Sequence, residues 1–134
     1  MNALEVIQLS ERYARAGDLE AARRTISDAM RVEQVWDPQL WSGMVSLMQT
    51  PEDYDLIREL WSVSPQENHR SIPVLRSMAR AACIAGWHQE GRTLLRKAIL
   101  LAARRKKSRL RNSLRKLKNS LQRRESFESK AQRA

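Results

Sequence analysis

The chain has 134 residues, of which 42% are hydrophobic and 30% are charged. This length suits one domain with a modest core plus a tail, and the apolar content excludes a chain that is disordered throughout. With only four Gly and four Pro, the sequence lacks the turn residues that a β-rich fold needs at short intervals. We therefore expect an all-α protein.

The net charge of +10 is unevenly distributed along the chain. Residues 104–134 contain thirteen Lys or Arg against two Glu, which gives +11, whereas residues 1–103 carry twelve basic against thirteen acidic residues, or −1. Clustered cations attract polyanions, and a nearly neutral body does not. We expect a helical-repeat domain over residues 1–103 and a basic amphipathic helical tail over residues 104–134.

Two helices are predicted at the start of the chain. Apolar residues recur at helical spacing up to Gly17, a residue that tolerates the left-handed conformation at a helix end, and this predicts a helix over residues 3–16. Asp18 can cap a second helix, whose apolar residues recur every three or four positions through Met30. The two segments predict a helical hairpin.

The middle of the chain contains two further helix starts. Asp37, followed by a proline, predicts a helix over residues 38–49, because Asp is a good N-cap and Pro suits the first helical position. Thr50, also followed by a proline, is predicted to cap a fourth helix that runs to about Val63.

Residues 64–71 have the composition of a loop with room for one short turn. Ser71 then opens a helix that is expected to end near Gly86. The last helix begins within residues 87–89 and meets no breaking residue for roughly thirty positions, so it is expected to be one long helix.

The helical hairpins recur at a period of about 34 residues. Alignment of Gly17 with Gly86 gives an offset of 69, close to twice that period. In the first hairpin, Val6, Leu9, Ser10, Tyr13, Gly17, Ala22, Ile26 and Ala29 resemble the large, Leu, small, aromatic, Gly, Ala, bulky, Ala pattern of tetratricopeptide repeats. The resemblance implies three stacked helix-turn-helix repeats, a short α-solenoid whose first helices line a concave groove.

The pentatricopeptide family, which reads single-stranded RNA, has nearly the same period and also fits the segment from Tyr13 to Gly17. Base reading needs small polar side chains in the groove, whereas Ile7 and Trp41 suit an apolar peptide or helix. We therefore rank protein binding first. The predicted partner-binding residues are Ile7, Glu11, Arg15, Trp41, Val45, Met48, Arg76 and Arg80.

Several of these residues have a second interpretation. Arg76 and Arg80, one turn apart, can clamp a carboxylate or phosphate, or can form a solvated face. Trp41 is either an exposed anchor or part of the core, and the tryptophans at 36, 61 and 87 are expected to pack between hairpins. Cys83, in an apolar segment, is interpreted as a small core residue.

No catalytic or metal site is expected. The chain has one Cys, and its two histidines, His69 and His88, lie without metal-ligand spacing. It has no phosphate-binding glycine loop, so we expect no enzyme activity and no cofactor. A single Cys excludes an internal disulfide, no apolar run approaches the roughly 20 residues of a membrane span, and the start lacks a secretory signal. We expect a cytoplasmic protein.

The tail predicts an amphipathic helix, because its leucines at 110, 114, 117 and 121 alternate at four- and three-residue spacing. This stripe can pack on the body, pair with a second copy through Leu110, Leu114, Leu117 and Leu121, or enter another protein's groove. The surrounding cations can contact nucleic acid, another acidic polymer or an anionic membrane surface. The predicted polyanion-binding residues are Arg104, Arg105, Lys106, Lys107, Arg109, Arg111, Arg115, Lys116, Lys118, Arg123 and Arg124.

Basic and leucine positions interleave in this tail, unlike in a leucine-zipper DNA reader, so we expect sequence-independent phosphate contact with nucleic acid ranked first. The leading hypothesis is a non-catalytic helical-repeat adaptor that holds a protein partner on its repeats and docks on a polyanion through its tail. The alternatives are a pentatricopeptide-like single-stranded RNA-binding protein and a regulatory domain of a larger enzyme.

Overall fold

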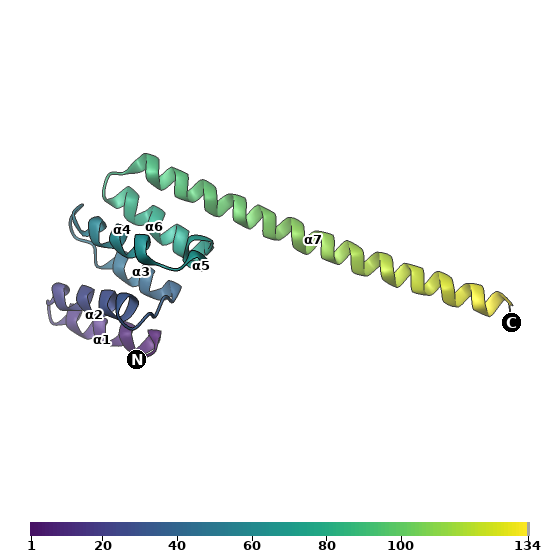
Figure 1. Cartoon of the computed structure of the whole chain (residues 1–134), viewed down its shortest axis with the longest axis horizontal. Coiled ribbons are helices and arrows are strands. Elements are labelled where there is room, and N and C mark those ends of the chain that lie inside the picture. The colour runs from purple at the N-terminus through teal and green to yellow at the C-terminus, as the bar shows by residue number, and fades with distance from the viewer. Residues whose placement is uncertain (134) are drawn as a thin grey trace. The chain divides into compact units, whose positions relative to one another are not determined.

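A computed structural model describes the backbone of residues 1–133 and the side chains of residues 1–123. Within residues 1–133 the protein has seven helices and no strand, so the expected all-α class is confirmed (Figure 1). The chain divides into two units, Met1–Ile99 and Leu100–Ala134. The boundary lies inside the last helix, slightly before the one expected after residue 103.

The first two helices form as the sequence predicts. They are α1 (Ala3–Arg15) and α2 (Leu19–Arg31). The Asn2 side chain accepts a hydrogen bond from the backbone N–H of Glu5, and the Asp18 carboxylate caps α2 in the same way. These side chains satisfy backbone donors that have no partner within the helix. Gly17 has a φ of +84° and reverses the chain between the two helices.

The next two helices are α3 (Pro38–Ser46) and α4 (Asp53–Val63). Asp37 caps α3 by accepting the backbone N–H of Gln39 at 2.9 Å, as expected. The helix ends at Ser46 rather than at residue 49.

The start of α4 differs from the prediction that Thr50 caps it. Glu52 occupies the cap position, and its side chain makes no capping hydrogen bond. The Asp53 carboxylate instead accepts the backbone N–H groups of Gln49 at 2.7 Å and Thr50 at 3.0 Å. The first residue of α4, Asp53, therefore accepts hydrogen bonds from the backbone N–H groups of the loop before it.

The predicted loop over residues 64–71 contains one short helix, α5 (Gln66–His69). It is followed by α6 (Ile72–Ile84), which Ser71 caps, and by α7 (His88–Arg133), which is a single helix of 46 residues. Gly86, with a φ of +88°, turns the chain between α6 and α7.

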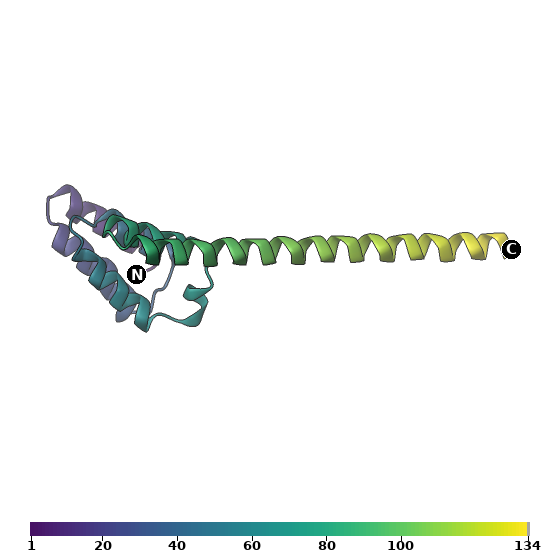
Figure 2. The same cartoon turned by 90° about the horizontal axis from the view of Figure 1, so that it is seen from above.

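Within the first unit, α1, α3 and α6 follow one another in that order (Figure 1), and α3 contacts both of the others. Seen from above, the helices of this unit overlap (Figure 2). The helix α2 packs against α1 and α3 and also contacts α4. Because α3 lies between two neighbours, two of its faces are covered.

The core of the first unit is formed mainly by side chains of α1 to α4 and α6, and Ala98 of α7 is also buried. Burial of each large apolar side chain stabilises the fold by about 1.5–3 kcal/mol relative to exposure. The largest fully buried side chains are Trp41, Tyr54, Ile26, Met30, Leu40, Met44, Ile57, Leu60, Leu75, Val6 and Val74. None of the described helices is both long and apolar enough to cross a bilayer.

Candidate functional site

An open pocket of about 380 Å³ lies between α1 and α3, and we call it the α1–α3 pocket. From α1 it is lined by Ile7, Ser10, Glu11 and Ala14, and from α3 by Gln39, Ser42, Gly43 and Ser46, with Ile26 and Leu47 completing it.

Gly43 allows α3 to approach α1 and α2 closely. A Cβ added at this position would lie 3.0 Å from Cδ1 of Ile26 and 3.1 Å from Cδ1 of Ile7. Any larger residue at position 43 would push these two isoleucine side chains aside. With glycine there, Ile7 and Ile26 form an apolar floor under the pocket.

The rim of the α1–α3 pocket is polar. Glu11, Gln39, Ser42 and Ser46 are exposed, and Ser46 donates its hydroxyl to the Ser42 carbonyl at 3.0 Å. An apolar floor under a rim with one carboxylate suits a ligand that combines an apolar side chain with a nearby cation.

Ile7 and Glu11, two of the predicted groove residues, line the α1–α3 pocket, but Trp41 and Val45 do not. Trp41 has no exposed surface and Val45 is 3% exposed, so the expectation that they face the groove is wrong. The face that α3 turns to the pocket is that of Ser42 and Gly43, and the opposite face packs into the core because α6 covers it.

The remaining predicted groove residues do not line this pocket. Met48 is partly buried against the core, and Arg15, Arg76 and Arg80 are exposed. The structure therefore gathers two of the eight predicted partner-binding residues, Ile7 and Glu11, at one pocket.

Trp41 belongs to a cluster of aromatic rings inside the first unit. Its ring stacks on Trp36 at a centroid distance of 6.1 Å and meets Trp61 edge-on at 6.0 Å. The imidazole of His69 stacks on Trp61 at 4.1 Å, and its Nε2 lies 3.0 Å from both Ser64 Oγ and the Trp61 carbonyl. These contacts hold the loop that contains α5 against α4.

Trp87 packs against α4 although it is 47% exposed. Its ring lies 6.3 Å from that of Tyr54, and the guanidinium carbon of Arg58 lies 4.5 Å from its centroid. The Arg58 Nε is also 3.8 Å from a Glu90 oxygen. A cation over an indole ring adds stabilisation of about 0.5–1 kcal/mol at exposed sites.

Two polar atoms near this contact are buried and have no hydrogen-bond partner among the described residues: Tyr54 Oη and Glu90 Oε2. Burial raises the pKa of the Tyr54 phenol, and the negative charge of Glu90 raises it further. Tyr54 therefore stays protonated at neutral pH, as a core residue and not as a base.

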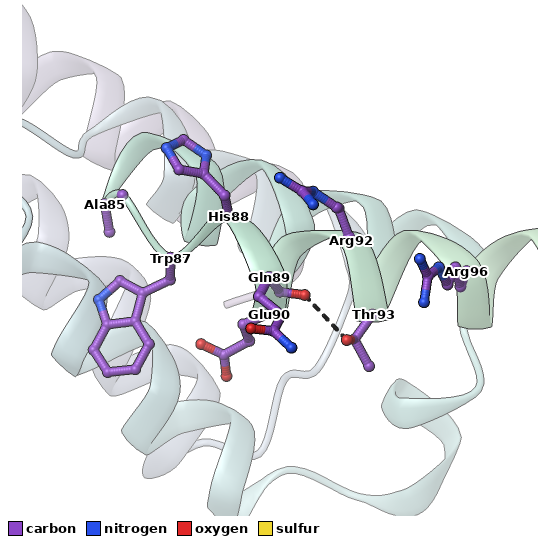
Figure 3. Close-up of a pocket in the computed structure, with 9 residues that line it drawn as sticks. Ala85, Trp87, His88, Gln89, Glu90, Arg92, Thr93 and Arg96 are labelled. Carbon is purple, nitrogen blue, oxygen red and sulfur yellow. Dashed lines mark hydrogen bonds between the residues drawn. The ribbon is translucent and has the colours of Figure 1, made fainter.

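A second open depression, of about 630 Å³, lies along the first turns of α7 and was not predicted (Figure 3). The side chains of His88 and Arg92 lie on one side of the α7 ribbon, and those of Trp87 and Glu90 lie on the other (Figure 3). Thr93 donates its hydroxyl to the carbonyl of Gln89 at 3.0 Å. All of its lining residues come from residues 85–96.

Cys83 is exposed, which corrects its interpretation as a core residue. Its sulfur faces the start of α7, where a Cβ added at Gly91 would lie only 2.6 Å from it. Within the described part of the chain, no group of three or more His, Cys, Asp or Glu side chains is placed to hold a metal ion.

The second unit consists of the later part of α7. Its leucines at 110, 114, 117 and 121 are each 50–59% exposed. At about 100° per residue these four leucines share one narrow stripe, while Ser108, Asn112 and Asn119 lie on the opposite side.

The ten basic residues predicted to bind a polyanion between 104 and 123 are all exposed. The side chain of Arg124, also predicted, lies outside the described residues. No Asp or Glu occurs between residues 100 and 124. Four of the cations, Arg104, Lys107, Arg111 and Arg115, line a shallow depression of about 380 Å³ together with Ser108 and Asn112.

No protein-family model matches the chain, and no curated protein or solved structure is similar enough to it to count as a match. The resemblance to tetratricopeptide repeats therefore remains a prediction from the sequence.

Proposed function

We propose that this protein is a non-catalytic helical adaptor that binds a polyanion, with nucleic acid ranked first, through the exposed basic segment of α7. One observation carries the proposal: ten exposed cations lie between residues 104 and 123, and no acidic residue lies among them. Each cation that neutralises a phosphate releases bound counterions, which makes such binding tight at low salt.

We also propose that the helices α1 to α4 and α6, with the start of α7, form a short stack of tetratricopeptide-like hairpins that holds a protein segment. The alignment of α1, α3 and α6 in one layer supports this arrangement. The α1–α3 pocket supports a peptide ligand, because its floor of Ile7 and Ile26 is apolar and because Glu11 at its rim attracts a cation and repels a phosphate.

A second candidate is single-stranded RNA binding on the repeats, in the manner of pentatricopeptide proteins. Gln39, Ser42 and Ser46 favour it, because they place small polar side chains at the pocket where Trp41 was expected. The carboxylate of Glu11 disfavours a phosphate backbone at the same place, and we rank this candidate second.

Binding of the full chain to fluorescent single-stranded RNA, duplex DNA and an acidic polysaccharide tests the proposal. We expect affinity for both nucleic acids that falls steeply as salt rises from about 50 to 200 mM. Absence of binding to both nucleic acids at low salt would contradict the polyanion proposal. Binding of RNA that is insensitive to salt would favour the second candidate.

A further inference from the structure

The leucine stripe is part of a longer heptad pattern. Leu100, Ala103, Lys107, Leu110, Leu114, Leu117 and Leu121 follow one another at steps of three, four, three, four, three and four residues. We call these seven positions the heptad seam. A regular 3.5-residue repeat over about 32 Å of helix is typical of a strand of a coiled coil.

Among the side chains of its own unit that the structure describes, none covers the heptad seam. Its five leucines are each 50–59% exposed, and six of its seven side chains are apolar. Exposed leucines at this regular spacing indicate a surface that a partner covers.

The seam is too narrow for a membrane surface. On one side it is bordered by Arg104, Arg111 and Lys118, and on the other side by Lys106, Ser113 and Ser120. A helix that lies in a bilayer or on a globular core needs an apolar face of about 100° or more, whereas a stripe limited to the two seam positions of each heptad fits one other helix.

A second copy of this chain is a poor occupant of the seam. A parallel pair would place Lys107 against Lys107 inside the seam and Lys106 of each copy beside Arg111 of the other. An antiparallel pair would bring the bordering arginines of one copy against those of the other. No acidic residue between residues 100 and 124 relieves this repulsion.

We propose that the heptad seam pairs with an acidic amphipathic helix of another protein. The partner carries Leu or Ile at its own seam positions and Glu or Asp at the flanking positions, where they meet Arg104, Arg111 and Lys118. A further acidic side chain opposite Lys107 fixes the register, because a single charged seam residue selects its partner and alignment.

This inference deepens the proposed adaptor function and shares part of the basic segment with it, because Arg104, Lys106, Lys107, Arg111 and Lys118 lie in or beside the seam. Arg109, Arg115 and Lys116 lie outside the seam and its two borders. A partner helix on the seam therefore leaves these three cations available to a polyanion, and the two interactions can be tested separately.

The test uses the full chain and three fluorescent synthetic peptides of equal length. The first has Leu at its seam positions and Glu at the flanking positions, the second has Lys at those flanking positions, and the third has the composition of the first in scrambled order. We expect the acidic heptad peptide alone to bind, with an increase in anisotropy and in helical circular dichroism.

The double substitution L114N/L117N should weaken binding of the acidic heptad peptide roughly 100-fold, because two apolar contacts are lost. The matched control R109Q/K116Q should leave that affinity within about threefold. Both pairs lie on exposed positions of α7, so neither should unfold the first unit. Retained nucleic-acid binding by L114N/L117N would show that the polyanion function stands apart from the seam.

Three results would overturn the inference. The scrambled acidic peptide could bind as tightly as the ordered one, which would show that charge alone suffices. The full chain could form a dimer in light scattering that L114N/L117N abolishes, which would assign the seam to a second copy. Vesicles of anionic lipid could bind the chain in a way that depends on Leu114 and Leu117, which would assign the leucines to a membrane.

Discussion

The indole Nε1 of Trp41 donates a hydrogen bond to Oδ1 of Asn68 at 3.0 Å, and both side chains are buried. This contact joins α3 to the loop between α4 and α6. It explains why the loop, which has few apolar residues, is held against the core.

Replacement of Trp41 by Ala should therefore destabilise the protein by about 3–5 kcal/mol, because it leaves a large cavity and removes the partner of Asn68. Urea denaturation followed by circular dichroism measures the change. Ser42→Ala, at the exposed neighbouring position, is the control and should stay within about 0.5 kcal/mol of the natural protein. An unchanged midpoint for W41A would contradict the burial of Trp41.

Gly43→Ala should destabilise the protein by about 1 kcal/mol although alanine is the better helix former. The added Cβ meets Ile26 and Ile7 at 3.0 and 3.1 Å, and overpacking of this kind costs about 1–3 kcal/mol, against a gain in helix propensity of about 1 kcal/mol. A higher melting temperature for G43A would show that the isoleucines move aside at little cost.

Gly91→Ala is expected to destabilise the contact between α6 and α7, because the new Cβ would lie 2.6 Å from Cys83 Sγ. Adding Cys83→Ala should restore part of the loss, since it removes the sulfur that the Cβ meets. A double-mutant cycle on the free energy of unfolding measures this coupling, which we expect to be about 1 kcal/mol. Purely additive effects would mean that the Ala79 carbonyl, 3.2 Å from the added Cβ, causes the strain.

The pH dependence of stability should report on Asp53. Partial burial raises its pKa, but the N–H groups of Gln49 and Thr50 and the charge of Arg23 outweigh burial, so the pKa lies below its usual value of 3.8. A depressed carboxyl pKa stabilises the fold above about pH 4, and this contribution is lost as the pH falls through the folded-state pKa.

Asp53→Asn should therefore lower the free energy of unfolding by about 1 kcal/mol at pH 7, and the difference should shrink as the pH falls below about 4. Urea midpoints across this range measure it. Asp55→Asn, at an exposed position in the same helical turn, is the matched control. A difference for D53N that stays constant down to low pH would contradict the assignment.

The helices were predictable where the signals are local. Asp18, Asp37 and Ser71 cap the helices that follow them, and Gly17 and Gly86 take a positive φ in the turns after α1 and α6. Each of these residues acts on backbone atoms close to it in the sequence. Thr50 shows the limit of such signals, since the competing carboxylate of Asp53 takes the donors of the same loop.

The rotation of α3 about its axis was not predictable from the sequence. Apolar residues occur on more than one of its faces, and only contact with both α1 and α6 decides that Trp41 is buried while Ser42 lines the pocket. Gly43 was the available signal that this face of α3 packs closely on its neighbours, because glycine in a helix interior is unfavourable unless close packing requires it.

The tail was easier to predict because its charge and leucine spacing need no tertiary contact. The heptad register alone identifies the residues that border the leucines, and most of these residues are basic. Their charge indicates the kind of partner that the seam accepts. The choice of partner could not follow from the leucines by themselves.

The most direct test of the central claim compares two charge-matched variants of the full chain in their affinity for nucleic acid. R109Q/R115Q/K116Q removes three cations of the tail, and R15Q/R76Q/R80Q removes three exposed cations of the first unit. The tail variant should bind weakly and should lower the slope of log K against log salt by about 2–3, whereas the first-unit variant should bind as the natural protein does. The opposite result, with affinity lost only when Arg15, Arg76 and Arg80 are replaced, would contradict a polyanion site in the tail and would place nucleic-acid binding on the first unit.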